Sequence, residues 1–533
     1  MQVTMACAFV LAGISLARFS IHTVWLYPLL AVLAVNVTGS VLSALSGWNS
    51  RIPSAATHRE TVRAWHADRT VWPSVDIFLP TCGEDMSVLF NTYTYVKNVQ
   101  WRGELRVLVL DDGGRDEVRA AAEEFGFDYL VRPNRGHMKK AGNLQYAFGQ
   151  SHGDFIAIFD ADFCPRADYL EHLVPYTEDR EVGIVQSPQY FSTEESMNWL
   201  ERTAGATQEL FYRWVQPSRD RAGAPICVGT CALYRREALS DVGGFAQIEH
   251  SEDVHTGIFL LRGGYRTRYV PILVSKGLCP SDLAGFLNQQ YRWCNGSITL
   301  LQSRVAQRQP LSLRQRLCFW AGFMYYISTA LNVFVLHVPA MVMAIFFADQ
   351  IRASHFIPFM AGAWVYFVLM PRVSVGQWRF EVMRTQMAYG FCHALAITHK
   401  LTGRTRGWVA TGAVGKSSSL ARTISKVGAA TLIVTLGVSW AAWGFDTYQY
   451  GLREFWTMGL FLLGYTYLSV PLIGGFARVL GIIAPSSSRP PQFTQFETGK
   501  NRISMFEAIG YSALILFAAV IASGYFDLVI PWS

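Results

Sequence analysis

Apolar residues fall into two patterns that divide the chain into membrane and soluble regions. Long apolar runs occur at both ends, whereas from residue 75 to about 275 short apolar runs alternate with amphipathic stretches. A continuous run of about 20 apolar residues predicts a membrane span. The spans are predicted at about 3–17, 23–45, 320–346, 356–373, 427–444, 455–476 and 505–527.

The middle region has the alternation of strands and helices that is typical of an α/β domain. Strands are predicted at 75–79, 105–110, 128–131, 155–159 and 182–186, and helices at about 86–98, 115–125, 138–149 and 167–177. This alternation predicts a mostly parallel, doubly wound sheet that is covered by helices.

Two amphipathic stretches, 281–302 and 376–400, predict helices that lie at the membrane surface. The expected regions are a transmembrane hairpin (1–48), a linker (49–74), the soluble domain (75–280), an interfacial helix (281–312), a transmembrane pair (313–375), an interfacial helix with a loop (376–426) and a region of about three spans (427–533). No soluble regulatory domain is expected after the last span.

Composition and charge support this division. The chain is 51% hydrophobic, with a net charge of +7. Lys and Arg dominate the stretches 400–426 and 477–502, which predicts that both loops, and with them the soluble domain, are cytosolic. We therefore expect a multi-pass protein of the plasma or inner membrane that contacts anionic lipid and no nucleic acid. The nine cysteines include no Cys-x-x-Cys, so structural zinc is not expected.

Acidic residues follow the predicted strands. Asp111-Asp112-Gly113-Gly114 follows one strand, Asp160-Ala161-Asp162 follows another, and Ser251-Glu252-Asp253 opens a helical stretch. Ligands of open α/β sheets bind at the carboxyl ends of the strands. Adjacent carboxylates repel each other, and a hard cation such as Mg²⁺ or Mn²⁺ offsets that repulsion. Asp-x-Asp alone is more often an acidic turn after a strand, and Glu252 at a helix start is more typical of a helix cap.

A second group of polar residues lies on the first amphipathic helix. Gln289, Arg292 and Trp293 form a Q-x-x-R-W pattern. Trp at a membrane surface is usually an anchor. A Gln and an Arg on the same helical face need another explanation, and Arg suits phosphate through its fork of donors.

These motifs together resemble the processive, membrane-embedded family 2 glycosyltransferases, which include cellulose, hyaluronan and chitin synthases. The resemblance extends from about 70 to 480. The matching pieces are Pro80-Thr81 with Glu84-Asp85, Asp111-Asp112-Gly113, Lys140-Ala141-Gly142-Asn143, Asp160-Ala161-Asp162, Val182-Gly183-Ile184-Val185-Gln186, Glu252-Asp253 and the Q-x-x-R-W.

The resemblance implies a cytosolic domain of the GT-A type and a role for each motif. Uridine is expected to contact Thr81, Glu84, Asp111 and Asp112, and Lys140 the nucleotide or its phosphates. Asp160 and Asp162 would hold Mg²⁺ or Mn²⁺, and Asp253, with Glu252 beside it, would be the general base. Gln289, Arg292 and Trp293 would bind the diphosphate and the acceptor end. A gating loop would include Lys400, Thr402 and Arg404, although an ordinary basic loop explains them equally well.

The activity that the resemblance implies is processive, inverting synthesis of a β-glucan from UDP-glucose, with export of the polysaccharide through the spans and partner proteins outside the membrane. Ile226-Cys227-Val228-Gly229-Thr230 departs from the Phe-Phe-Cys-Gly-Ser of cellulose synthases, so the linkage stays open. The alternatives are a hyaluronan- or chitin-type synthase, transfer of one sugar to a lipid carrier, or a transporter with a cytosolic sensing domain.

Overall fold

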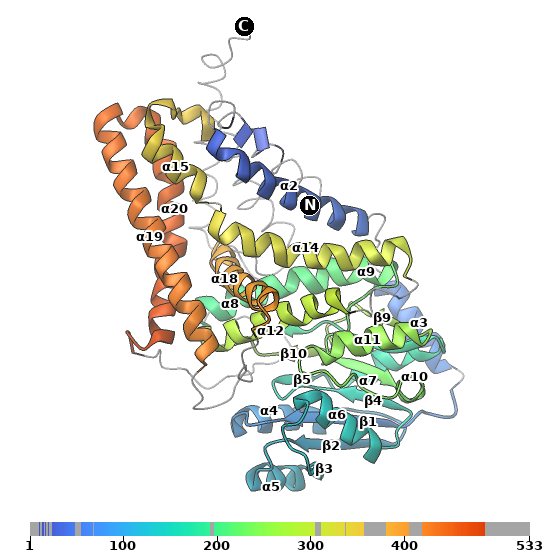
Figure 1. Cartoon of the computed structure of the whole chain (residues 1–533). Coiled ribbons are helices and arrows are strands. Elements are labelled where there is room, and N and C mark those ends of the chain that lie inside the picture. The colour runs from blue at the N-terminus through green and yellow to red at the C-terminus, as the bar shows by residue number, and fades with distance from the viewer. Residues whose placement is uncertain are drawn as a thin grey trace.

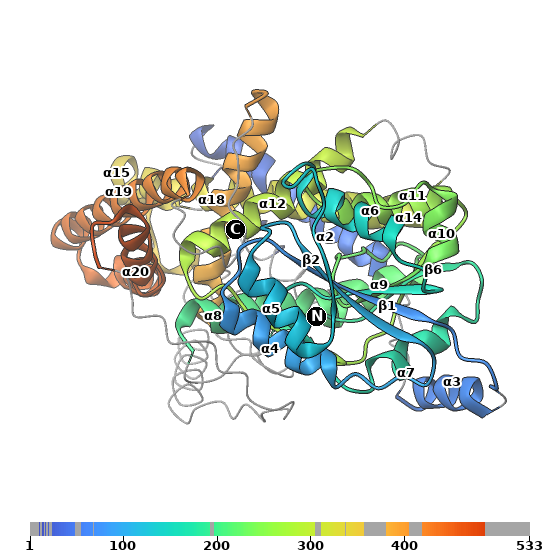
Figure 2. The same cartoon turned by 90° about the horizontal axis from the view of Figure 1, so that it is seen from below.

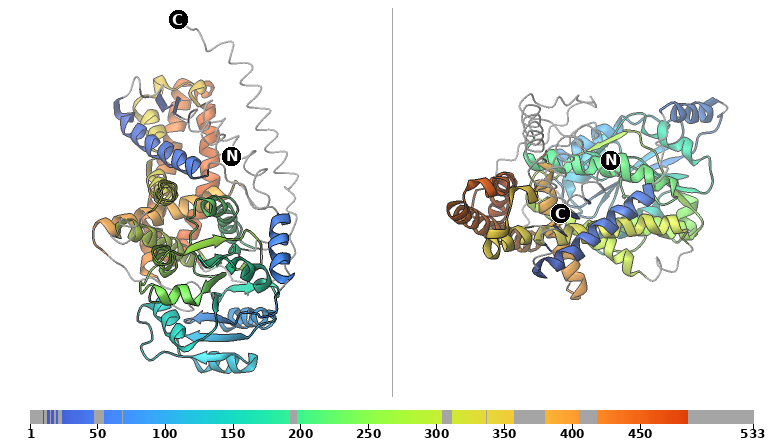
Figure 3. Two further views of the ribbon diagram at one scale, coloured as in Figure 1. Left: turned by 90° about the vertical axis from the view of Figure 1, so that its right-hand side faces the viewer. Right: turned by 90° about the horizontal axis from the view of Figure 1, so that it is seen from above.

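A soluble α/β domain lies beneath a group of long helices in the computed structural model (Figure 1). The structure describes residues 10, 13–14, 16–17, 20, 24–47, 55–67, 69–191, 197–303, 311–335, 337–356, 380–404 and 418–484. Figure 3 shows the same two levels from the side, with the long helices stacked above the sheet.

The soluble domain is built on a seven-stranded sheet with the order β3-β2-β1-β4-β8-β6-β9. The strands are β1 (Val75–Thr81), β2 (Leu105–Asp111), β3 (Asp128–Leu130), β4 (Phe155–Ile158), β6 (Val182–Gln186), β8 (Ala232–Arg235) and β9 (Arg266–Tyr269). The first four are parallel, whereas β8 runs antiparallel to both β4 and β6. All five predicted strands are present, but β8 and β9 were not predicted.

Helices cover both faces of this sheet (Figure 2). One face packs on α4 (Met86–Lys97), α5 (Asp116–Phe125) and α7 (Tyr169–Leu173), and the other on α6 (Lys139–Gln150), α10 (Arg236–Asp241) and α11 (Glu252–Arg262). Successive β1 residues, Ile77 and Phe78, belong to different core clusters. Burial on both faces explains why the strands read as continuous apolar runs.

A second, three-stranded sheet begins directly after Asp162. It contains β5 (Phe163–Pro165), β7 (Tyr190–Phe191) and β10 (Ser275–Gly277) in the order β5-β10-β7. Gly277 lies opposite Phe163 in the antiparallel pair, and the Phe163 ring fills the space that a side chain at 277 would need. These strands are too short for a periodic apolar pattern to predict them.

Four helices among the described residues are long and apolar enough to cross a membrane. They lie at Tyr27–Gly47, Leu313–Phe346, Ser419–Tyr450 and Leu452–Leu480. They correspond to α2 (Tyr27–Gly47), α14 (Leu313–Val335) with α15 (Val338–Phe346), α19 (Ser419–Tyr450) and α20 (Leu452–Leu480). Most of the expected span at 3–17, nearly all of 356–373 and all of 505–527 lie outside the described residues.

Two helices connect these levels. They are α12 (Leu283–Gln302) and α18 (Val382–Leu401), which pack against each other, and α18 also packs against α14. Buried residues occur around the whole circumference of α18, including Arg384, Thr385 and Phe391. The amphipathic pattern at 376–400 therefore marks a helix that is enclosed by other helices.

Arg384 joins α18 to a break in the hydrogen bonding of α20. Pro471 lies inside α20 and has no N–H for the Tyr467 carbonyl one turn earlier. The Arg384 guanidinium donates to the Tyr467 carbonyl at 3.0 Å and to the Leu468 carbonyl at 3.1 Å. The carbonyl that Pro471 leaves without an intrahelical donor is satisfied in this way.

Candidate active site

Three loops meet at one edge of the large sheet because β1 pairs in parallel with both β2 and β4. Thr81 lies opposite Asp111 at the ends of β1 and β2, and Phe159, just before Asp160, donates its N–H to the Phe78 carbonyl. The motifs that the sequence singled out after these strands are therefore neighbours in space.

The first of these loops is closed by Glu84. Its carboxylate accepts from the Thr81 hydroxyl and from the Cys82 N–H, both at 2.6 Å. The Arg115 guanidinium donates to the Glu84 carbonyl at 2.9 Å and so ties this loop to the one after β2.

Asp111 shapes the turn that follows β2. Its carboxylate accepts from the Gly113 N–H at 2.8 Å, the Arg115 N–H at 2.7 Å and the Tyr129 hydroxyl at 2.9 Å. Burial and the Asp111 charge raise the pKa of Tyr129 to about 12, which keeps its hydroxyl a donor at neutral pH. The Asp111 carboxylate is therefore fixed in place by hydrogen bonds from neighbouring protein groups.

Asp112 forms a buried ion pair with Arg132. The guanidinium donates to both carboxylate oxygens, at 2.6 and 2.7 Å, and the Arg132 side chain is fully buried. Arg132 also donates to the carbonyls of His137 and Lys139, so it holds the segment that leads to Lys140. Arg132 was not predicted from the sequence, although its place directly after a predicted strand was a signal.

Each residue of Lys140-Ala141-Gly142-Asn143 has a distinct place at the start of α6. The Lys140 ammonium contacts Asp160 and Ala141 is buried. A side chain at Gly142 would collide with the Arg132 guanidinium and the His137 carbonyl. Asn143 donates to the Leu110 carbonyl at 2.8 Å and joins α6 to the end of β2.

Lys140 is the centre of an acidic group. Its ammonium lies 2.5 Å from an Asp160 oxygen, 3.7 Å from a Glu252 oxygen and 3.1 Å from the Gly229 carbonyl. Burial lowers the pKa of Lys140, but the acidic neighbours outweigh it and raise the pKa above its usual range. Glu252 therefore reaches into the site, and its interpretation as a helix cap is wrong, since Ser251 occupies the N-cap position.

The carboxyl groups of Asp162 and Asp253 both have raised pKa values. Burial, with the neighbouring charge of Asp160, raises the pKa of Asp162 to about 7. Burial, with the charge of Glu252, raises the pKa of Asp253 to about 7, although Lys140 and Arg292 oppose the shift. A carboxyl group whose pKa lies near neutral pH can accept a proton during a reaction, so Asp253 has the property of a general base.

The segment 226–231 faces Asp160 and Asp253. The Thr230 hydroxyl accepts from the Asp160 N–H at 2.9 Å, and a side chain at Gly229 would collide with that of Asp253. Three buried glutamines fix this segment through its backbone, namely Gln186, Gln189 and Gln216. Gln186, which ends the Val-Gly-Ile-Val-Gln motif, thereby acquires a positioning role that sequence reasoning had not assigned.

Residues with strained backbone conformations lie next to Lys140, Thr230 and Glu252 in the chain. Among the described residues, four non-glycine residues have a positive φ: Met138, Lys139, Cys231 and Ser251. Met138 and Lys139 precede Lys140, Cys231 follows Thr230, and Ser251 precedes Glu252. Such conformations cost about 1–3 kcal/mol each and persist where the surrounding structure enforces them, as at functional sites.

The helices α12 and α18 border the site from the membrane side. Arg292 lowers the pKa of Asp253, so its positive charge lies close to that carboxyl group. The Tyr291 hydroxyl contacts His399 at 2.9 Å, and Lys400 donates to the Thr299 hydroxyl at 3.4 Å.

The remaining predicted residues of these helices are described only in part. Gln289 and Trp293 are half-buried on α12. Thr402 donates its hydroxyl to the Thr398 carbonyl, and Arg404 donates its N–H to the His399 carbonyl, so both extend the end of α18. The rest of the expected gating loop, 405–417, lies outside the described residues.

Asp160 and Asp162 could bind a divalent cation if the phosphates of a substrate supplied further ligands. The described residues contain no group of three or more His, Cys, Asp or Glu side chains that could hold a metal by itself. Asp160 and Asp162 supply hard oxygen ligands, and the raised pKa of Asp162 reflects negative charge that lacks compensation. Mg²⁺ is often bound by one or two carboxylates together with substrate phosphates.

Comparisons with known proteins show which families and folds the chain is similar to. Residues 155–376 match the family model described as Glycosyl transferase family group 2. The chain is 36% identical over 267 residues to the cellulose synthase catalytic subunit [UDP-forming] of Xanthomonas axonopodis pv. citri, covering 49% of this chain and 36% of that protein. It is 34% identical to cellulose synthase 1 of Komagataeibacter xylinus, covering 53% of this chain and 18% of that protein.

The fold also has a relative among solved structures. The mannosyltransferase PcManGT from Pyrobaculum calidifontis, solved with GDP-Man and Mn²⁺, aligns with a TM-score of 0.50 at 18% identity and covers 70% of this chain and 99% of that chain. The predicted fold class and the predicted resemblance to cellulose synthase-like family 2 glycosyltransferases are confirmed. The matched part spans less than half the length of these cellulose synthases.

Proposed function

We propose that this protein is a UDP-sugar-dependent, processive, inverting glycosyltransferase that polymerises a β-linked glucan from UDP-glucose at the cytosolic face of the plasma or inner membrane. The growing polysaccharide would pass outward through the membrane helices to partner proteins. The observation that carries the proposal is the position of Asp253. A carboxyl group with a pKa of about 7 lies beside Arg292 and within the Lys140–Asp160–Glu252 group.

Asp253 would act as the general base. It would take the proton from the acceptor hydroxyl, whose oxygen then forms the new bond to the anomeric carbon as the bond to the diphosphate breaks. The proton ends on Asp253 and the electron pair on the diphosphate. Because attack and departure occur on opposite faces, an α-linked donor gives a β-linked product. Glu252 would hold Lys140 in place beside Asp160.

Asp160 and Asp162 would hold Mg²⁺ or Mn²⁺ with the donor's diphosphate. When bound, the cation would neutralise the charge that develops on the leaving diphosphate. Lys140 would stabilise the same charge after exchanging part of its contact with Asp160 for a phosphate oxygen. Thr230 fixes the Asp160 backbone and so sets the direction in which the carboxylate points.

The nucleoside would lie against the loops after β1 and β2. Thr81 and Glu84 form one wall, and Asp111 and Asp112 the other. The lone pairs that remain on these carboxylates would accept from the uracil N–H and the ribose hydroxyls. The Arg132 pair would keep the second wall in place while the nucleotide enters and leaves.

The acceptor end would lie against α12. Arg292 would bind the diphosphate through its planar fork of donors, Trp293 would offer a ring face to the terminal sugar, and Gln289 would hydrogen-bond its hydroxyls. Lys400, Thr402 and Arg404, at the end of α18, would begin a loop that closes over the donor and excludes water.

The test is polymer formation by the purified full chain. The protein would be incubated separately with radiolabelled UDP-glucose, UDP-N-acetylglucosamine and UDP-glucuronic acid in Mg²⁺, and any polymer digested with linkage-specific glucanases. Glucanase-sensitive polymer from UDP-glucose alone is expected. Incorporation of the other donors would favour a hyaluronan- or chitin-type synthase, and no incorporation would contradict the proposal.

A pair of variants tests the base. Asp253→Asn is expected to lower the rate by roughly 10²–10⁴-fold while UDP still binds. Asp116→Asn is the matched control, because Asp116 also lies in the first turn of a helix but is exposed. Wild-type synthesis by Asp253→Asn would remove Asp253 from the mechanism.

A further inference from the structure

Basic side chains converge on one face of α12 from three other elements. Arg292, Gly296 and Thr299 follow one another at spacings of four and three, so they share that face. Gly296 leaves no room for a side chain because the Ser251 side chain packs directly on it, which brings the end of the 246–251 segment against the helix. His250 precedes Ser251 and lies close enough to Arg292 for the two side chains to interact electrostatically.

Two lysines complete the group. Lys400 reaches α12 from α18 through the Thr299 hydroxyl at 3.4 Å. Lys139 begins α6 in a strained conformation, with a φ of 46°. Gln247 donates to the Ala141 carbonyl at 3.1 Å and ties the start of α6 to the segment that carries His250.

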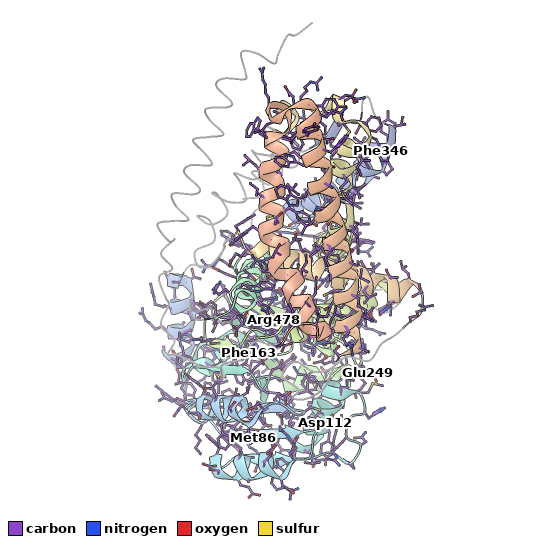
Figure 4. The ribbon with its side chains drawn as sticks, turned by 90° about the vertical axis from the view of Figure 1, so that its left-hand side faces the viewer. Met86, Asp112, Phe163, Glu249, Phe346 and Arg478 are labelled. Atoms are coloured by element: carbon purple, nitrogen blue, oxygen red, sulfur yellow. The ribbon has the colours of Figure 1, made fainter. Side chains whose placement is uncertain are left out.

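The charges of these residues act on one another. Burial, followed by the charges of Lys139, Arg292 and Lys400, lowers the pKa of His250 to about 4, and Glu249 opposes the shift. Burial also lowers the pKa of Lys139, with Arg292 in the same direction and Glu249 against it. Figure 4 shows Glu249 nearer than Asp112 to the long helices.

Four basic groups from four elements cost free energy when they face each other, and an anion of high charge relieves that cost. Asp160, Glu252 and Asp253 cluster around Lys140, which follows Lys139 in the chain, so the basic group lies next to the acidic residues. In a displacement, the departing diphosphate carries the largest negative charge that the site must hold.

We propose that Lys139 and His250 bind the departing nucleoside diphosphate, and that His250 takes up one proton from solvent when the diphosphate arrives and returns it when the product leaves. The inference rests on the proposed function and adds two residues that the motifs did not single out. The negative charge of the bound diphosphate would offset the positive charges of Lys139, Arg292 and Lys400 at His250, so the protonated imidazole becomes the favoured form.

The proton uptake has a direct measurement. Binding of UDP to the purified full chain in Mg²⁺ would be followed by calorimetry at pH 6 in two buffers of different ionisation enthalpy, which gives the number of protons taken up. Asp162 and Asp253 also change their protonation, so the difference between the wild type and His250→Gln isolates His250. We expect the variant to take up fewer protons and to bind UDP roughly tenfold more weakly.

A second variant is expected to have the opposite effect. Glu249 is exposed, so Glu249→Gln is not expected to disturb folding. Removing its negative charge leaves the basic group more attractive to an anion, and UDP binding should tighten severalfold. His152→Gln, at an exposed histidine of the same domain, is the control that changes neither affinity nor proton uptake. Uridine, which lacks phosphates, should bind all variants equally.

The outcomes separate this inference from the proposed function. Equal affinity and equal proton uptake in the wild type and His250→Gln would overturn the inference, as would weaker UDP binding by Glu249→Gln. If the wild type makes no polymer from any UDP-sugar yet binds UDP with His250-dependent proton uptake, the proposed function fails and the diphosphate site stands.

Discussion

Two pairs of aspartates lie at the ends of β2 and β4, the strands on either side of β1, and their carboxylates have opposite surroundings. Asp111 and Asp112, after β2, receive donors from backbone, Tyr129 and the buried Arg132. Asp160 and Asp162, after β4, receive one lysine between them, and the pKa of Asp162 rises to about 7. The first pair is compensated by protein, whereas the second keeps negative charge for a ligand to offset.

The difference teaches that an acidic motif has no fixed meaning. Asp112 is paired because Arg132 follows the adjacent strand β3, at the same sheet edge. Asp162 lies beyond β4, whose other neighbour, β8, runs antiparallel and brings Thr230 and a backbone turn to that edge. Whether a carboxylate is structural or available for a ligand thus depends on what the next strand in space delivers.

The largest expected effect is on catalysis by the second pair. Asp162→Asn should abolish polymer synthesis, because the cation that it would hold supplies several kcal/mol of transition-state stabilisation, on the order of 10³-fold in rate. The measurement is incorporation from labelled UDP-glucose, with circular dichroism to show that the fold is retained. Activity within a few-fold of the wild type would contradict the assignment.

Substitution in the first pair, Asp111 and Asp112, should lower the stability of the fold. Asp112→Asn leaves the Arg132 guanidinium buried without a counter-charge, which costs about 3–5 kcal/mol. Thermal unfolding of the detergent-purified chain, followed by fluorescence, should show a clear fall in melting temperature. Asp112→Asn combined with Arg132→Met should recover part of the loss. Unchanged melting of the single variant would show that the pair is not structural.

The two pairs should also differ in pH dependence. The pKa of Asp162 is higher in the folded than in the unfolded chain, so the folded state binds more protons between about pH 4 and pH 7. Its contribution to stability is therefore favourable below that window and is lost as pH rises through it, by up to about 4 kcal/mol.

Thermal melts across this range in EDTA should show the decline, and Asp162→Asn should flatten it. Added Mn²⁺ should restore stability above pH 7, where the ionised carboxylate is available to the cation. A decline of equal size in Asp162→Asn would assign the effect to other groups, such as Asp253.

The smallest effect concerns the direction of Asp160. Thr230→Val keeps the shape of the side chain but removes the acceptor for the Asp160 N–H, which should lower the rate about tenfold. Thr230→Ser retains the hydroxyl and should restore most of the rate. If the serine variant is as slow as the valine variant, the hydrogen bond is not what positions Asp160.

Much of this arrangement was accessible from the sequence. Long apolar runs and buried parallel strands have strong signals in the sequence. The five strands from 75 to 186 could therefore be placed, as could the spans at 23–45, 320–346, 427–444 and 455–476, which correspond to helices that the structure describes. The motifs after those strands gave Asp160, Asp162, Lys140 and Asp253. The antiparallel β8 was not predicted, because four residues carry too weak a pattern and their pairing depends on distant partners.

Contacts between residues that are distant in sequence could not be predicted either. Arg132, Thr230 and Gln186 act through contacts with residues distant in sequence, and no local pattern identifies those contacts. Glu252 was interpreted from its place at a helix start, which is correct for the backbone, but its side chain points to Lys140. The basic group around His250 depends on the packing of α6, α12 and α18.

The most direct test of the distinction between the two pairs is a Mn²⁺ titration followed by electron paramagnetic resonance, with the purified full chain in the presence of UDP. The wild type is expected to bind one Mn²⁺ per chain with UDP, and Asp162→Asn to lose that binding. Asp112→Asn, kept at a temperature where it remains folded and at a UDP concentration that saturates its weakened nucleoside site, should retain it. Wild-type Mn²⁺ binding by Asp162→Asn, with loss of binding in folded Asp112→Asn, would contradict the account.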